Sequence, residues 1–162
     1  MRRRDREMYY DFGLHVIDKS PYAVLSMINA ADKTPYCVPI SAARICNSVY
    51  FHCALTGQKI DNLMADPNVC ISFVSDVNPI SEKYTTEYES AIVKGTAEHI
   101  NDENEKIEAL HAICLKYAAD NMDNFQNAIN KLLSRTAVWK IEIKELTGEY
   151  PKVYVNLQTD VR

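Results

Sequence analysis

The chain has 162 residues and a net charge of −4 at pH 7, with 47% of its residues apolar and 25% charged. These values are typical of one globular domain, residues 1–162, and they exclude the strongly basic surface of a nucleic-acid-binding domain. No apolar run approaches the roughly 20 residues that cross a bilayer, and none follows the basic N-terminus as in a signal peptide, so we expect neither a membrane span nor secretion.

The first half of the chain predicts one helix and three strands. Met8, Phe12 and Val16 recur at helical spacing and predict a helix to about Lys19, which Pro21 ends. The predicted strands are 22–29, 34–45 and 49–54. Pro39 lacks the N–H that a sheet ladder needs, so its strand is expected to lie at an edge or to carry a bulge.

Side chains of the strand 49–54 alternate between two faces. Val49, Phe51 and Cys53 share one face, which suits the core of the protein. His52 shares the opposite face with Tyr50, and this face is expected to meet less apolar surroundings.

The rest of the chain predicts further strands and helices. They are a short helix over 57–66, strands over 68–77 and 85–100, a helix that begins after Asp102, a helical segment over 124–134 and a last strand over 136–148. Gly95 indicates a bulge or a close backbone approach within its strand, and Asp102 with Glu105 matches a capping box. Six strands joined mostly by short turns predict an α+β fold that is mainly β, with an antiparallel sheet curled into a barrel.

The start of the short helix is a candidate anion site. Thr56 and Gly57 precede this helix, and Gln58 and Lys59 lie in its first turn. Free backbone N–H groups and the positive end of the helix dipole attract anions there, whereas a lysine is unfavourable at that end. A bound phosphate would remove this conflict. The alternative is a solvated surface lysine.

His52 is the histidine most suited to chemistry. It could hydrogen-bond a ligand or donate a proton near neutral pH. The alternative is a structural histidine at the barrel rim or at a subunit interface. The other histidines, His15, His99 and His111, form no pair at a metal-ligand spacing, so we expect no metal site.

The cysteines indicate a reducing compartment. Their number is odd and none lie in a C-x-x-C spacing, which argues against a disulfide framework: Cys37, Cys46, Cys53, Cys70 and Cys114. Most lie within apolar runs, where a free cysteine behaves as a small hydrophobic residue. We therefore expect a cytoplasmic protein.

Several motifs resemble those of a known family. They are "VPIS", "YFHCALTGQK", "DNLMADPNV" and "YESAIVKGTAE", and the resemblance extends from "RRRDREM" to "TAVWKIEIKELTG". The chain resembles the flavin-binding split-barrel superfamily, in the branch of nitroimidazole-resistance proteins related to pyridoxamine 5′-phosphate oxidase. This resemblance implies a six-stranded antiparallel split β-barrel with flanking helices. It also implies a homodimer with FMN, or alternatively FAD, in a groove between the subunits.

The resemblance also implies which residues contact the flavin. The backbone of Val38, Pro39 and Ile40 and the side chain of Ser41 would lie beside the ring. His52 would lie close to the flavin, and the phosphate-binding loop would comprise Thr56, Gly57, Gln58 and Lys59. Ser90 would reach the flavin from the other subunit.

The implied function is that of an FMN-dependent oxidoreductase. It would reduce a small planar acceptor such as a nitroimidazole, another nitroaromatic or a quinone, with His52 as the catalytic residue that orients the acceptor or supplies a proton. The strand 34–45 carries only Arg44 as a basic residue, and residues 147–162 have no counterpart of the vitamin oxidase's Trp/Arg substrate segment, which argues against oxidation of pyridoxamine phosphate. The alternatives are a non-catalytic flavin or haem carrier or sensor, with His52 as a haem ligand, and a structural dimer with an empty groove.

Overall fold

The computed structural model describes residues 6–150. The strands are β1 (Glu7–Met8), β2 (Ala23–Ile28), β3 (Pro35–Ile40), β4 (Ala42–Ile45), β5 (Ser48–Cys53), β6 (Asn68–Ile80), β7 (Thr85–His99) and β8 (Ala137–Glu149). The α-helices are α1 (Tyr10–Lys19), α2 (Gln58–Ala65), α3 (Glu103–Tyr117) and α4 (Phe125–Leu132). Residues 2–5 of the N-terminal motif and residues 151–162 of the C-terminal segment lie outside the described residues.

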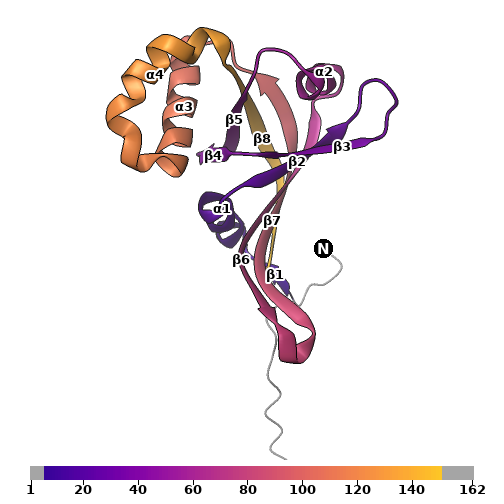
Figure 1. The fold of residues 1–162 in the computed structure, drawn as a ribbon. Helices are drawn as coiled ribbons and strands as arrows, with labels where there is room; N and C mark the ends of the chain where they lie inside the picture. Colours follow the sequence, from indigo (N-terminus) through magenta and orange to yellow (C-terminus); the bar gives the residue numbers. More distant parts are fainter. Residues whose placement is uncertain (1–5, 151–162) are drawn as a thin grey trace, which may run out of the picture.

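One antiparallel sheet forms the body of the protein (Figure 1). Its strand order is β3-β2-β6-β7-β8-β5-β4, and β1 pairs with β8. The two edge strands, β3 and β4, are consecutive in the chain and are separated only by Ser41. The sheet therefore curls until its two edges meet at Ser41, which is the split of the barrel.

The expected strand count was too low. The predicted strand 34–45 is divided at Ser41 into β3 and β4, and Met8, predicted to lie in a helix, belongs to β1. Met8 is opposite Gly148 on β8, so pairing with a strand distant in sequence replaces the first helical turn. Pro39 lies in an edge strand, as predicted.

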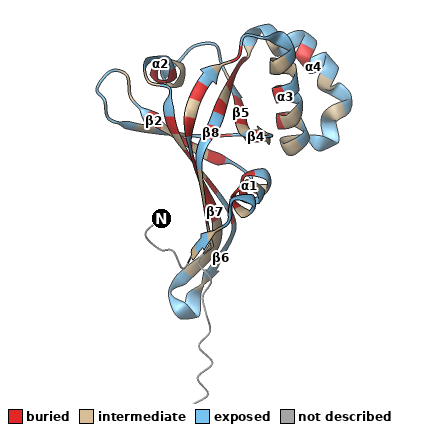
Figure 2. Ribbon diagram, turned by 180° about the vertical axis from the view of Figure 1, so that it is seen from behind, coloured by how far each residue is buried: buried red, intermediate tan, exposed pale blue. Residues whose placement is uncertain are grey.

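The barrel core lies between the sheet and α1. Val16 and Ile17 of α1 pack in one cluster with Leu25, Phe51 and Trp139 of the strands, all buried. Figure 2 shows the buried residues gathered where the strands and helices meet, whereas the tip of the β6–β7 hairpin is exposed. All five cysteines are free. Within residues 6–150, none of the helices is long and apolar enough to span a membrane.

A second helical layer covers the other side of β5. Tyr50 and Val138 of the sheet pack there with Leu110 of α3 and Ile129 of α4. The start of α3 is held by the predicted cap, because the Asp102 carboxylate accepts a hydrogen bond of 2.8 Å from the backbone N–H of Glu105.

The β7–β8 ladder contains the predicted irregularity. Its register shifts between Lys94 and Gly95, which confirms the bulge expected at this glycine. Gly95 is buried against β8, so the absence of a side chain allows the close approach of the two backbones.

Candidate functional site

The end of β5 separates two cavities. Cys53 faces a cavity of about 270 Å³ at the mouth of the barrel, between β3 and the start of α2. We call this the Lys59 cavity, and its lining residues are Tyr36, Val38, Cys53, Ala54, Thr56, Gly57, Gln58, Lys59 and Ile60. His52 lines a different cavity on the α3–α4 side. The sequence reasoning placed His52 and Lys59 around one ligand, whereas the structure places them on two sides of one strand end.

The N-terminus of α2 opens into the Lys59 cavity. Gly57, the residue before the helix, has a φ of 131°, a conformation that favours glycine, and open space lies where a Cβ would stand. No side chain within residues 6–150 caps this helix, so its first N–H groups are available to a ligand. The local structure is that of an anion-binding helix start.

Lys59 is directed into the barrel mouth. Its side chain is half-buried, and its Nζ lies 5.3 Å from the centroid of the buried Phe51 ring. The solvated surface lysine considered above is therefore not what the structure shows. Within the described residues, Lys59 has no acidic partner, so its charge is available to an incoming anion.

The split of the barrel places Ser41 near His52. The β4–β5 ladder ends where Ala42 is opposite Phe51, so Ser41 and His52 are the next residues beyond this pair on the two segments. Both residues are exposed. Val38 faces the core and lines the Lys59 cavity, whereas Pro39 is exposed and lies opposite Val24 on β2.

His52 lies at the edge of an apolar cavity of about 150 Å³. Partial removal of water from its ring, with a smaller contribution from the charge of Lys59, lowers the pKa of His52 below its ordinary value. Because the ordinary pKa of histidine already lies below 7, this lowering favours the neutral imidazole at pH 7. The neutral ring carries one N–H donor and one nitrogen acceptor, so it can orient a ligand by hydrogen bonds.

Ser90 lies apart from both cavities. It is on the outer face of the sheet, opposite Val74 of β6 and Glu149 of β8, beside a cavity of about 440 Å³. Within one chain the structure therefore does not bring Ser90 together with the residues of β3, β5 and α2. The expected contribution of Ser90 from a second subunit stays a prediction.

The end of α3 holds the β4 side of the split. The hydroxyl of Tyr117 accepts a hydrogen bond from the N–H of Ala42 and donates one to its carbonyl, at 3.1 and 3.0 Å. Lys116 Nζ donates to the carbonyls of Ala42 and Ile17, at 3.0 and 2.9 Å. Burial lowers the pKa of Lys116, and the nearby charge of Asp18 opposes this shift. The two side chains fix the backbone next to Ser41.

Sequence reasoning missed part of this region. The alternation of side chains in β3 could have placed Tyr36 beside Val38, because both face the same cavity. Nothing local could have shown that Tyr117 reaches Ala42, 75 residues away in the chain. Arg44, the only basic residue of the predicted strand 34–45, is paired with Asp18 by hydrogen bonds of 3.0 and 2.5 Å and is not directed to the Lys59 cavity.

The fold and the motifs match one known family. Residues 14–150 match the family model described as pyridoxamine 5′-phosphate oxidase. The chain belongs to this family. No curated protein sequence matches the chain significantly.

Several solved structures superpose on the chain. A candidate 5-nitroimidazole antibiotic resistance protein from Bacteroides thetaiotaomicron is 25% identical, with a TM-score of 0.75 over 89% of this chain and 86% of that one. An FAD- and haem-binding protein from Mycobacterium smegmatis is 17% identical, with a TM-score of 0.77 over 92% and 75% of the two chains. An FAD-binding protein from Mesorhizobium loti is 18% identical, with a TM-score of 0.66 over 91% and 98%. The last two similarities show the fold alone.

Proposed function

We propose that the protein is an FMN-dependent oxidoreductase that reduces a small planar acceptor such as a nitroaromatic or a quinone. The observation that carries the proposal is the half-buried Lys59 at the uncapped start of α2, in a cavity at the mouth of the barrel. Membership of the pyridoxamine 5′-phosphate oxidase family and similarity to FAD-binding proteins support a flavin as the ligand.

The residues of the Lys59 cavity fit a phosphate group. Backbone N–H groups at a helix start and a lysine ammonium are the usual partners of phosphate, and open space at Gly57 lets the ligand approach the backbone. Thr56 and Gln58 line the same cavity and can donate further hydrogen bonds. Lys59 would hold the phosphate of FMN. The negative charge of the phosphate would compensate for the unfavourable position of a lysine at the positive end of the helix dipole.

The flavin ring would lie along the sheet edge formed by the backbone of Val38, Pro39 and Ile40 and by Ser41, where the Pro39 and Ser41 side chains are exposed and that of Ile40 is buried in the core. This edge adjoins the Lys59 cavity through Val38 and approaches His52 through Ser41. When bound, the flavin would supply the hydride or electron chemistry. Because the lowered pKa leaves His52 neutral, its role would be to orient the acceptor by a hydrogen bond rather than to donate a proton from an imidazolium.

We further propose a homodimer formed through the outer face of the sheet. The helix α1 covers the other face of β6, β7 and β8, where Leu146 approaches Gly13. The outer face presents exposed Val74 and Val77 beside half-buried Tyr88 and Ile92, around the cavity of about 440 Å³. An apolar sheet face of this kind is suited to a second subunit, which could bring its Ser90 to the flavin.

The decisive experiment compares FMN with riboflavin, which lacks the phosphate. The wild-type protein is expected to prefer FMN, and Lys59→Gln should weaken FMN binding by roughly 10- to 150-fold, because a charge-assisted hydrogen bond contributes about 1.5–3 kcal/mol. Riboflavin affinity should change little. Lys131→Gln removes an exposed charge on α4 and serves as the matched control. Flavin fluorescence quenching measures all affinities.

Three outcomes would contradict parts of the proposal. Equal loss of FMN and riboflavin affinity in Lys59→Gln would show that the phosphate binds elsewhere. A Soret band on addition of haem, without any flavin binding, would favour the haem carrier. Turnover is tested by mixing the photoreduced, FMN-loaded protein with nitrobenzene in the absence of oxygen and following reoxidation of the flavin. Reoxidation no faster than that of free reduced FMN would contradict a reductase and favour a flavin carrier.

A further inference from the structure

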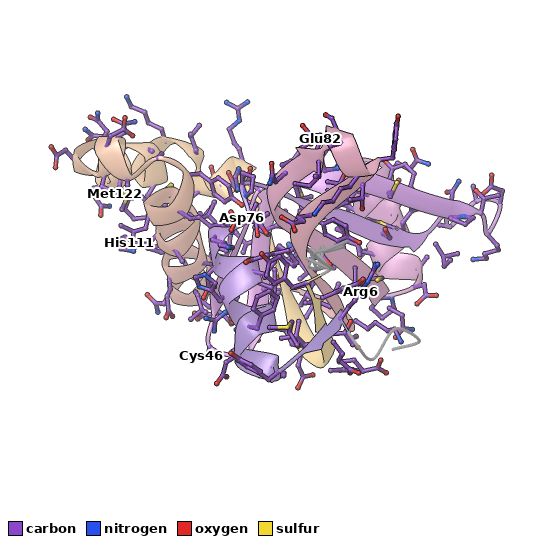
Figure 3. The ribbon with its side chains drawn as sticks, turned by 90° about the horizontal axis from the view of Figure 1, so that it is seen from below. Arg6, Cys46, Asp76, Glu82, His111 and Met122 are labelled. Atoms are coloured by element: carbon purple, nitrogen blue, oxygen red, sulfur yellow. The ribbon has the colours of Figure 1, made fainter. Side chains whose placement is uncertain are left out.

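The cavity beside His52 has the chemistry of a binding site for an aromatic ring. Side chains from α3, from α4 and from the segment that follows α4 form its walls. The main contributors are Leu110, Ile113, Phe125, Ile129, Leu132 and Leu133. Figure 3 shows this helical layer, where His111 and Met122 are labelled, at one side of the sheet and apart from the β6–β7 hairpin at Glu82.

The size of this cavity matches one small ring. Its volume is about 150 Å³. An enclosed cavity of about 150 Å³ lined by leucine, isoleucine and phenylalanine binds benzene, and this one has a similar volume and lining but opens to solvent beside the exposed Leu132 and His52. A tetrapyrrole such as haem is several times larger than such a ligand and does not fit inside.

One polar ring stands at the edge of these apolar walls. Within residues 6–150 the His52 ring has no protein hydrogen-bond partner. The hydroxyl of Thr136, which also lines the cavity, already donates to the carbonyl of Leu132 at 2.9 Å. A ligand that enters the cavity therefore meets three polar groups: the Thr136 oxygen, which can still accept a hydrogen bond, the Cys114 thiol, a weak donor, and the His52 ring, which offers both a donor and an acceptor.

The lining selects against charged ligands. A carboxylate inside these walls would lose its water without a paired cation, which costs free energy, and Lys59 lines the other cavity. The Phe125 ring in this wall packs edge-on against the His111 ring with centroids 5.1 Å apart, so an aromatic surface is available to a flat neutral ring.

We propose that this cavity binds a small neutral aromatic ring whose polar substituent is hydrogen-bonded to His52. Under the proposed function, on which this second role rests, the ring is that of the electron acceptor. Ser41, the expected flavin neighbour, and His52 are the next residues beyond the end of the β4–β5 ladder. His52 is then a positioning residue that holds the acceptor between the flavin edge and the α3–α4 walls.

Binding of phenol to the flavin-free protein tests the assignment. With isoleucine and leucine methyl groups labelled for NMR, phenol should shift the signals of Ile113, Ile129 and Leu110 and the ring signals of His52. Benzoate, which has the same ring with a carboxylate, should bind at least tenfold more weakly. No methyl shift with phenol, or equal affinity for benzoate, would overturn the proposal.

Two pairs of variants locate the ligand. Ala128→Phe fills the cavity from α4 without replacing a buried residue and should weaken phenol binding at least tenfold, whereas Asn127→Phe on the same helix should leave it unchanged. His52→Leu should weaken phenol about fivefold and leave benzene binding unchanged, since only phenol offers a hydrogen-bonding group. Full phenol affinity in Ala128→Phe would overturn the site, and equal losses for phenol and benzene in His52→Leu would overturn the hydrogen bond.

The outcomes separate this inference from the proposed function. Phenol binding without FMN binding would leave the cavity assigned and the flavin proposal refuted. FMN binding without phenol binding would support the flavin proposal and refute the assignment of the cavity.

Discussion

At the scale of single residues, Gly95 limits what the sheet tolerates. A Cβ at this position would lie 2.1 Å from the carbonyl oxygen of Glu142 and 2.8 Å from Cγ2 of Ile141. The first contact is with backbone of the paired strand β8, which cannot move without breaking the ladder. Gly95→Ala should therefore lower the free energy of unfolding by about 3 kcal/mol or more.

A second glycine supplies the control for this prediction. At Gly13 the nearest atoms belong to the flexible side chain of Leu146, at 2.9 to 3.1 Å. Gly13→Ala should cost less, because Leu146 can change rotamer and alanine raises helix propensity by about 1 kcal/mol. Urea unfolding followed by circular dichroism measures both variants. Equal destabilisation would show that backbone crowding at Gly95 is not the cause.

At the scale of elements, the end of α3 decides where the strand bends at Ser41. The backbone of Ala42 is hydrogen-bonded by the Tyr117 hydroxyl and by Lys116, which lie at the end of α3, 75 and 74 residues away in the chain. Without these partners the barrel edge beside Ser41 would lose its anchor. The position of the expected flavin edge therefore depends on how α3 packs against the barrel.

Removal of the Tyr117 hydroxyl tests this coupling. Tyr117→Phe should lower the free energy of unfolding by about 1–3 kcal/mol, because Ala42 is buried and its backbone groups lose a partner. FMN affinity should fall as well if the edge becomes mobile. Tyr10→Phe removes an exposed hydroxyl bonded to Asn47 and is the matched control, expected to change stability by less than about 0.5 kcal/mol. Thermal unfolding and flavin titration check both variants, and an unchanged Tyr117→Phe protein would contradict the anchoring role.

The first turn of α3 is stabilised both by a contact within the helix and by contacts with the sheet. Asp102 caps its first turn as the sequence predicts, but the Glu105 carboxylate accepts from Tyr50 Oη at 3.1 Å and Lys140 Nζ at 2.9 Å on the sheet. In a complete capping box this carboxylate would accept a hydrogen bond from the backbone N–H of Asp102. In this protein it binds side chains of the sheet instead.

At the scale of the whole molecule, the outer sheet face is the expected contact between subunits. Ile92 lies near its centre, between Ser72 and Thr147 in the register of the sheet. Ile92→Glu should convert the proposed dimer to a monomer, because a buried, unpaired carboxylate is costly at an interface. Sedimentation equilibrium measures the mass of the particle.

The control for the dimer is a second change of an apolar residue to glutamate. Leu115 is exposed on α3, away from the outer face, and Leu115→Glu should leave the mass unchanged. If the flavin lies between subunits, Ile92→Glu should also release FMN. A wild-type protein that is monomeric at all concentrations would refute the proposed assembly.

Much of this protein follows from local pattern. The alternation of apolar residues predicted the main strands, Gly95 predicted the bulge, and Asp102 predicted the start of α3, because each depends on residues within a few positions of one another. The placement of Lys59 in the first turn of α2 was predictable for the same reason.

The tertiary structure alone decided the rest. It assigned Met8 to β1, divided the second predicted strand at Ser41, and set His52 and Lys59 in separate cavities on two sides of β5. These features depend on partners far away in the chain, namely β8 for Met8, α3 for the backbone beside Ser41, and the α3–α4 walls for His52. A local pattern states which face of a strand is apolar, but only the closed barrel determines what that face meets.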